Sequence, residues 1–424
     1  MARRWIAVLC LAFTASAYGQ IPEAPAPPPS SAQEAASPLA AKPRPAKAKL
    51  GQVAQAELAP NPMGPAGPVW PTRAWESAPP PPGANLPAAQ ALLDEAFGAS
   101  DGPLGETRAL VIVHSGRIVM ERYAKGYTDQ TRHVSWSVAK SFTQALVGIA
   151  AREGRLDPAA AMGSPLWDAR DPRQALPWTT WLQMVDGQHY VEIGAPSFTQ
   201  SDAAKKLFGP GVADVARYCA GLPTAHPPGT FWNYNSCGIV LTADALTRKI
   251  VPDAADAKDR RARMSAWMRA ALFEPIGMRS ALVEFDHQGL FFGSALIYAS
   301  ARDYAKFGLL YLHDGVWDGR RLLPEGWVDF ASTHGPAPNA DVYGAGWWVT
   351  PKSGPGRPYH SLIQGEPRDA YAAQGFEGQY IVVVPSKDLV IVRLGRTPES
   401  EPRLAAMGAW MTALVRAFPD APIP

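Results

Sequence analysis

The stretch Ser137-Val-Ala-Lys140 is the only Ser-x-x-Lys sequence in this 424-residue chain, and it opens an apolar run of helical spacing over residues 138–150. Residues three apart on a helix lie on one face, with Cβ atoms about 5–6 Å apart. The helix N-terminus presents positive partial charge and free N–H groups to the serine oxygen. A lysine packed there loses solvation, which lowers its pKa and lets its neutral amine take a proton. The stretch therefore predicts a serine nucleophile with a lysine base, and a capping serine followed by a surface lysine is the alternative.

A second stretch offers a phenol and a hydroxyl at another helix start. The turn Pro228-Gly229 precedes Tyr234-Asn-Ser236, and an apolar helical run follows over residues 239–246. Such groups can complete a proton path to a leaving group. A tyrosine buried for packing, with its hydroxyl bonded to backbone, is the plainer interpretation.

A third stretch places glycines at the entrance of a strand. Ala373-Gln374-Gly375-Phe376 leads into Glu377-Gly378 and a β-branched run over residues 380–384. Glycine at a strand entrance lets a substrate approach the backbone closely, and the strand edge can offer an N–H group to an oxyanion. Taken alone, this pattern is weak.

Together, and in this order, the three stretches resemble the Ser-x-x-Lys, Tyr-x-Asn/Ser and Lys-Thr-Gly elements of class C β-lactamases and penicillin-binding DD-peptidases. The nearest resemblance is to β-lactamase-related esterases and nylon-oligomer (6-aminohexanoate) hydrolases, and it runs from about residue 86 to the C-terminus. Further stretches that look like this family's scaffold are residues 184–187, 300–310, 314–319 and 343–348.

The resemblance implies a role for each motif residue. Ser137 is expected to be the acylated nucleophile, Lys140 its base and Tyr234 the partner acid and base, with Ser236 in the hydrogen-bond network. The oxyanion would be held by the backbone N–H groups of Ser137 and Phe376. No cofactor is needed for covalent acyl transfer of this kind.

Two departures from the family pattern bear on the substrate. Ala373-Gln374-Gly375 stands where a β-lactamase has Lys-Thr-Gly, so the cation and hydroxyl that hold a β-lactam carboxylate are missing. Residues 189–192, His-Tyr-Val-Glu, show no clear register with the acidic, tyrosine-bearing loop of the nylon-oligomer hydrolases. These departures argue against penicillin and aminohexanoate as physiological substrates.

Trp136 lies beside the expected nucleophile and is a candidate for the wall of an apolar pocket.

Strand patterns at both ends of the globular part indicate the fold. Strands are expected at 108–114 and 117–123 early, and at 344–350, 379–384 and 389–394 late, with helices at 87–97 and 402–418. We therefore expect an α/β (α+β) fold of the β-lactamase and transpeptidase type. One antiparallel sheet would be built from 86–130 and 341–424, flanked by helices, around a helix-rich insert at 131–340.

The N-terminal 85 residues predict export. Residues 1–19 have a basic start, a short apolar stretch and a small-residue end, as a signal peptide does. Residues 20–85 are rich in Pro and Ala, which predicts a disordered tether. We expect a periplasmic or secreted protein with no transmembrane segment in the mature chain, whose tether could contact the cell envelope.

Composition excludes other classes of function. The net charge is only +2, which gives no basic field for nucleic acid. His133 and His189 have no acidic or cysteine partners at ligand spacing, so we expect no metal.

Cys219 and Cys237 could form a disulfide in an oxidising compartment, but the favoured interpretation is that they are two small buried residues. A Gly-x-Ser-x-Gly match at Ser100 follows a helix rather than a strand and is predicted to be inert.

The sequence thus predicts a serine hydrolase acting on a small ester, amide or peptide-like substrate. A β-lactamase or DD-peptidase is the alternative within the family. A non-catalytic cell-envelope binding protein on the same fold is the alternative from another class, although a binding module has no need of Ser137, Lys140 and Tyr234 together.

Overall fold

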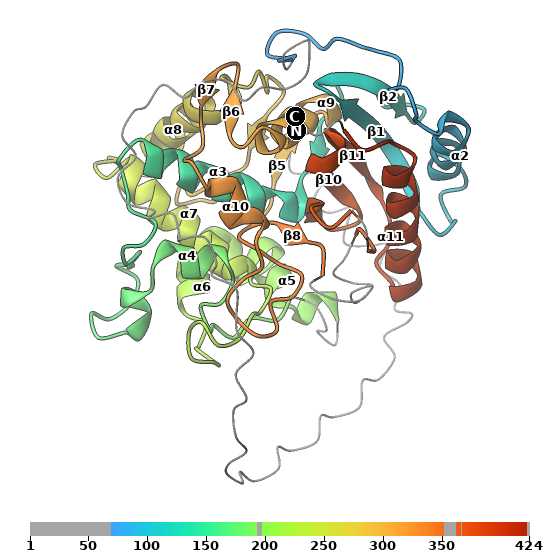
Figure 1. Cartoon of the computed structure of the whole chain (residues 1–424). Helices are drawn as coiled ribbons and strands as arrows, with labels where there is room; N and C mark the ends of the chain where they lie inside the picture. Colours follow the sequence, from blue (N-terminus) through green and yellow to red (C-terminus); the bar gives the residue numbers. More distant parts are fainter. Residues whose placement is uncertain (1–68, 193–196, 352–361, 366, 422–424) are drawn as a thin grey trace, which may run out of the picture.

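The computed structural model describes residues 69–192, 197–351, 362–365 and 367–421 (Figure 1). The predicted signal peptide, residues 1–19, and the part of the predicted tether before residue 69 lie outside the described residues. Within the described part, no helix combines the length and the apolar character needed to cross a bilayer.

A six-stranded antiparallel sheet forms the centre of the fold, in the order β2-β1-β11-β10-β9-β8. The chain adds strands from both ends, because β1 pairs with β11 over its whole length. This confirms the predicted fold class. The strands of this sheet are β1 (Glu106–His114), β2 (Arg117–Tyr123), β8 (Trp348–Val349), β9 (Tyr371–Gly375), β10 (Gln379–Val384) and β11 (Leu389–Arg396).

One edge of the sheet differs from the prediction. The expected strand at 344–350 is reduced to β8, and β9, which was not predicted, pairs beside it. Gly344 and Gly346 explain the shortening. Gly346 has a φ of +74°, and the Gly344 N–H donates to the Trp347 carbonyl, so the chain turns here instead of extending.

Helices and short strands make up the rest of the described chain. The helices are α2 (Leu86–Ala96), α3 (Ala139–Arg152), α4 (Trp178–Leu182), α5 (Asp202–Phe208), α6 (Val215–Ala220), α7 (Ser236–Ile250), α8 (Ala257–Met268), α9 (Ala301–Leu312), α10 (Trp327–Ser332) and α11 (Glu401–Arg416). The short strands are β3 (His133–Val134), β4 (Leu282–Val283), β5 (Ile297–Ala299), β6 (Val316–Trp317) and β7 (Arg320–Arg321).

The sheet is covered on both faces, as Figure 1 shows, with α2 and α11 on one side and the helical region on the other. Successive residues of a strand point to opposite faces. Accordingly, Leu110 and Ile112 of β1 pack in the cluster that contains α11, whereas Val111 and Val113 join the larger core that contains α9. Both faces of β1 are therefore buried, which accounts for its nearly continuous apolar sequence.

The segment just before α2 packs against the body of the protein. The Trp70 ring lies 5.0 Å from the Trp317 ring, and the Ala78 N–H donates to the Ile118 carbonyl of β2 at 3.0 Å. The tether predicted to extend to residue 85 therefore differs from the structure over 69–85. Buried tryptophan surface and a backbone pairing outweigh the proline content there.

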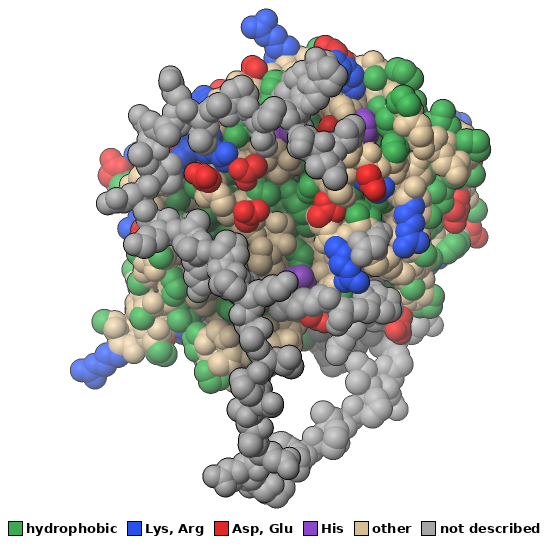
Figure 2. Space-filling model, in the orientation of Figure 1, with side chains coloured by type: hydrophobic (Ala, Val, Ile, Leu, Met, Phe, Trp, Pro, Cys, Tyr) green, Lys and Arg blue, Asp and Glu red, His purple; other side chains and the backbone are tan. Residues whose placement is uncertain are grey.

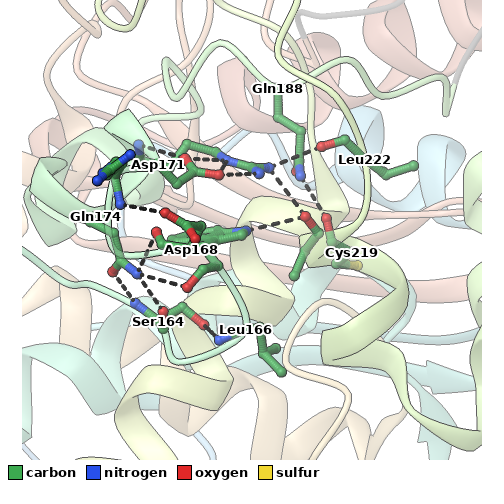
Figure 3. A network of polar contacts seen from close by, with 12 residues as sticks. Ser164, Leu166, Asp168, Asp171, Gln174, Gln188, Cys219 and Leu222 are labelled. Atoms are coloured by element: carbon green, nitrogen blue, oxygen red, sulfur yellow. Dashed lines mark hydrogen bonds and ion pairs between the residues drawn. The ribbon is translucent and has the colours of Figure 1, made fainter.

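Cys219 and Cys237 form a disulfide that joins α6 to the first turn of α7. The favoured interpretation of two unpaired thiols is therefore wrong. Gln188 donates from Nε2 to the Cys219 carbonyl at 2.6 Å. Figure 3 shows this bond within a polar network that also holds Leu222, two residues beyond the end of α6, against residues 164–174.

Candidate active site

Ser137 lies in a 3-10 turn, Trp136–Val138, that leads directly into α3. Trp136 has a φ of +43°, in the left-handed region that a bulky side chain rarely adopts. The residue before this turn is fixed to β5, because the Ser135 N–H donates to the Ile297 carbonyl at 2.7 Å. Such strain persists only where surrounding contacts impose it, and it is typical of functional turns.

Lys140 is buried beneath this turn and points at the serine. Its Nζ donates to Ser137 Oγ at 2.7 Å, and the side chain is 1% exposed. Burial lowers the pKa of Lys140 to about 8, and the Glu192 carboxylate, 3.8 Å away, acts in the opposite direction. A substantial fraction of this amine is therefore neutral near pH 8, as a proton acceptor must be.

Tyr234 lies against the same two groups. The Lys140 Nζ is 4.5 Å from the centre of the Tyr234 ring. Burial raises the pKa of Tyr234 well above its usual value, with the Glu192 carboxylate adding to the effect, while a hydrogen bond with Ser137 lowers it. The phenol is therefore protonated at neutral pH, which suits it to give a proton before it takes one.

Ser236 begins α7 and connects the site to Glu192. Its Oγ donates to Glu192 Oε2 at 2.5 Å. The helix start is fixed by Asn235, whose side chain accepts from two backbone N–H groups of the first turn and donates to Asp186 Oδ1 at 3.1 Å. This cap presents Tyr234 and Ser236 to the site from one short segment.

Glu192 is a site residue that the sequence motifs did not identify. Its carboxylate contacts both Ser236 and Lys140. The segment 189–192, which contains it, showed no clear register with the acidic, tyrosine-bearing loop of the nylon-oligomer hydrolases. The contact depends on the path of the loop, which no local spacing predicts.

The end of β9 lies against the nucleophile turn. A Cβ on Gly375 would collide with the Ser135 carbonyl and stand 3.2 Å from the Ser137 nitrogen, so only glycine allows this approach. The rings of Phe376 and Trp136 meet edge to face with centroids 5.7 Å apart. The structure thus brings Gly375, Phe376 and Trp136 together beside Ser137.

Aromatic side chains continue around the phenol. Trp348 lies 5.1 Å from the Tyr234 ring and 5.1 Å from the Tyr343 ring, measured between centroids. Trp232 is 6.0 Å from Trp348. These rings give the neighbourhood of Tyr234 an apolar wall.

Among the described residues, no group of three His, Cys, Asp or Glu side chains is arranged to hold a metal ion. His133 is buried and packs with Tyr127, whose ring centroid lies 5.6 Å away. Burial lowers the pKa of His133 to about 4. Its surroundings are those of a neutral core histidine.

The beta-lactamase family model matches residues 106–413, and the chain belongs to this family. It is 24% identical over 317 residues to the 6-aminohexanoate-dimer hydrolase of Paenarthrobacter ureafaciens, covering 70% of this chain and 74% of that protein. The solved structure of a candidate 6-aminohexanoate-dimer hydrolase from Bacillus anthracis has a TM-score of 0.59 at 23% identity, covering 78% of this chain and 83% of the other.

A class C β-lactamase from Rhodobacter sphaeroides has a TM-score of 0.52 at 16% identity, covering 78% of this chain and 98% of the other. At such identities the solved structures establish a shared fold. Together with the family membership, they confirm the predicted fold and class: the chain is a hydrolase of the serine type, related to the 6-aminohexanoate-dimer hydrolase.

Proposed function

We propose that the protein hydrolyses an ester or amide bond through an acyl-enzyme on Ser137, with Lys140 as the base. The observation that carries this proposal is the buried Lys140 amine, 2.7 Å from Ser137 Oγ, with its pKa lowered to about 8. A capping serine with a surface lysine does not fit this geometry, because Lys140 is 1% exposed.

The proposed reaction moves one proton around three groups. Neutral Lys140 accepts the Ser137 hydroxyl proton as Oγ forms its bond to the substrate carbonyl carbon. The backbone N–H groups of Ser137 and Phe376 stabilise the resulting oxyanion, an assignment supported by the approach of Gly375 to the Ser137 nitrogen. Tyr234 donates its proton to the leaving group as that bond breaks, and the Lys140 ammonium restores the phenol.

Deacylation reverses these roles. A water molecule loses a proton to the same base as its oxygen attacks the acyl carbon, and Ser137 Oγ leaves with a proton. Apart from the substrate and this water, every group in the proposed cycle belongs to the protein. The Ser236 hydroxyl, bonded to Glu192, keeps the carboxylate oriented beside Lys140.

The surroundings favour an uncharged ester or amide over a β-lactam. Ala373 stands in β9, two residues before Gly375, where the family pattern has a lysine. Glu192 adds a negative charge beside the amine. The face drawn in Figure 2 carries both acidic and basic side chains. A substrate carboxylate placed beside Glu192 would be repelled by that like charge.

The relatives keep an amide among the candidate substrates. The protein from Paenarthrobacter ureafaciens is named for hydrolysis of the 6-aminohexanoate dimer, which contains an amide bond. We therefore include short linear amides in the proposed substrate class beside esters, and we rank esters first because their leaving groups need less protonation.

Labelling with a fluorophosphonate, followed by mass mapping of the adduct, tests the nucleophile directly. We expect one adduct, on Ser137, and none in Ser137→Ala. The matched control is Ser100→Ala, because Ser100 carries the other hydrolase-like sequence pattern; this variant should label as the wild type does. An adduct on any other residue, or labelling of Ser137→Ala, would show that the assignment is wrong.

We also propose that the protein is exported, with a tether before residue 69 that could reach a cell-envelope partner. The disulfide between Cys219 and Cys237 supports an oxidising compartment. Expression of the whole chain in a bacterial host, fractionation and N-terminal sequencing provide the test. A periplasmic chain beginning near Gln20 is expected, and an uncleaved cytoplasmic chain would contradict export.

A further inference from the structure

A buried arginine near the end of β11 contacts the turn that joins β9 to β10. Arg393 is 0% exposed. Its five N–H groups make five hydrogen bonds, and each ends on a carbonyl or hydroxyl oxygen, those of Leu104, Glu106, Thr107, Glu377 and Gly378. Burial lowers the pKa of Arg393 to about 10, so the side chain is a cation at neutral pH. A buried cation bonded to uncharged oxygens is costly to keep, so its position needs an explanation beyond packing.

The five bonds join two segments that are far apart in the sequence. Nη2 donates to the Leu104 carbonyl at 2.9 Å, and Nε donates to the Thr107 hydroxyl at 3.1 Å, at the start of β1. Nη1 donates to the Gly378 carbonyl at 2.8 Å and to the Glu377 carbonyl at 3.4 Å. Because β1 is paired with β11 over its whole length, the guanidinium ties the β9–β10 turn to a fixed part of the sheet.

The backbone of this turn requires such support. Glu377 and Gly378 both lie in the left-handed region, with φ values of +58° and +85°. A glutamate adopts this conformation only where surrounding contacts impose it. Arg393 binds the carbonyls of these same two residues. A Cβ on Gly378 would collide with the guanidinium, so the contact also requires glycine there.

Two further groups fix the turn to β11 and the residue after it. The buried Gln379 side chain donates to the Phe376 carbonyl at 3.0 Å and to the Gly395 carbonyl at 2.8 Å, and it accepts the Gly395 N–H at 3.1 Å. The Thr397 N–H donates to the Glu377 carbonyl at 2.9 Å. Each carbonyl from residue 376 to residue 378 is therefore bonded, and Arg393 binds two of the three.

The other side of the same segment lies against the nucleophile. A Cβ on Gly375 would stand 3.2 Å from the Ser137 nitrogen, and the Phe376 ring meets the Trp136 ring edge to face. In the proposed reaction the N–H groups of Ser137 and Phe376 hold the oxyanion. Stabilisation of this kind depends on where the donors point, so a shift of the turn would weaken it.

We propose that Arg393 is a positioning residue for the hydrolysis: by binding the Glu377 and Gly378 carbonyls, it fixes the turn so that the Phe376 N–H points at the developing oxyanion. The inference rests on the proposed function. A guanidinium suits this task because its rigid fork presents donors in fixed directions, whereas a lysine is a compact point charge and a methionine has no donor.

The experiment measures kcat/KM for p-nitrophenyl butyrate and the inhibition constant of butylboronic acid. Boron bonds to the serine Oγ, and an oxygen of the tetrahedral adduct takes the place of the oxyanion, so the inhibition constant reports how well the donors are placed. We expect Arg393→Met to lower kcat/KM about tenfold or more and to raise the inhibition constant by a similar factor. Arg393→Lys should lie between the wild type and Arg393→Met.

Arg396→Met is the matched control on the same strand. Arg396 Nε lies 3.2 Å from the Glu377 carboxylate, and its side chain is 47% exposed. An exposed ion pair contributes little, so both constants should stay within about threefold of the wild type. A loss in Arg396→Met as large as that in Arg393→Met would show that charge beside the turn matters, rather than bonds to its backbone, and would overturn the inference.

The remaining outcomes separate the two proposals. A folded Arg393→Met enzyme with both constants within about threefold of the wild type contradicts the inference. So does a fall in kcat/KM with an unmoved inhibition constant, because a smaller folded fraction alone gives that result. Should Arg393→Met fail to fold, Arg393→Lys decides: one ammonium cannot reach both segments, so an unmoved inhibition constant there contradicts the inference as well. A wild type that neither turns over esters nor binds the boronic acid overturns the proposed function itself.

Discussion

Two buried lysines in this molecule each donate to a serine at 2.7 Å, Lys140 to Ser137 and Lys206 to Ser294. The serines of the two pairs differ in their exposure to solvent. Ser294 is 1% exposed, whereas Ser137 is only partly buried. If Ser137 is the nucleophile, as proposed, and Ser294 is not, a lysine bonded to a serine is not sufficient to make one. The serine must also face a space that a substrate can enter.

The local backbone separates the pairs further. Ser137 follows Trp136, which has a left-handed conformation, and the end of β9 at Gly375 lies against its turn. Ser294 lies behind α3, next to Gly293, whose carbonyl binds the Thr143 hydroxyl. In the proposed mechanism the first environment supplies the backbone N–H groups that hold the oxyanion, whereas the second is a packed interior.

The largest expected effect is the loss of hydrolysis when Ser137 is replaced, compared with the retention of hydrolysis when Ser294 is replaced. Ser137→Ala should lower kcat/KM for p-nitrophenyl butyrate by at least about a thousandfold, because no acyl-enzyme can form. Ser294→Ala should retain the reaction. Melting temperatures of both variants provide the check on folding. A Ser137→Ala enzyme with more than a few per cent of wild-type activity would mean that the two pairs have been assigned the wrong roles.

A smaller effect is expected when Tyr234, the proposed proton donor beside the Lys140–Ser137 pair, loses its hydroxyl. Tyr234→Phe should slow acylation by an amide roughly 10²–10⁴-fold, because a poor leaving group must be protonated as it departs. Acylation by an activated ester should be slowed much less. Single-turnover rates with one p-nitrophenyl ester and one p-nitroanilide measure both. Equal losses with the two substrates would exclude Tyr234 as the donor to the leaving group.

The smallest effect concerns the missing lysine of the third motif. A charge-assisted contact is worth about 1.5–3 kcal/mol, or roughly 10–150-fold in binding, so Ala373 should leave nitrocefin a poorer substrate than p-nitrophenyl butyrate. Comparison of kcat/KM for the two substrates measures this. Ala373→Lys should bring kcat/KM for nitrocefin closer to kcat/KM for p-nitrophenyl butyrate. Nitrocefin turnover at or above that of the ester would instead favour a β-lactamase.

The parts of the site that local spacing sets could be predicted from the sequence. Ser137 and Lys140 share one helix start, and Tyr234 and Ser236 share another, so three-residue patterns suffice to bring each pair together. The sheet was predictable for a similar reason. Its long strands near both ends of the domain consist of apolar, β-branched residues, which indicates full burial.

The remaining features depend on contacts between distant segments. Glu192 enters the site because Asp202 holds the neighbouring residue, and Lys206 reaches Ser294 across 88 positions of sequence. Neither contact leaves a short-range pattern. The Cys219–Cys237 pairing likewise follows from the packing of α6 on α7.

The central claim is that Lys140 acts as a neutral base, and the acylation rate of Lys140→Arg tests it most directly. Arginine keeps the positive charge but cannot give up its proton. At pH 8, near the pKa of Lys140, we predict that single-turnover acylation by p-nitrophenyl butyrate falls by about a hundredfold or more in Lys140→Arg, and equally in Lys140→Ala. A Lys140→Arg enzyme that acylates within a few-fold of the wild type would show that the charge matters and that proton transfer belongs to Tyr234.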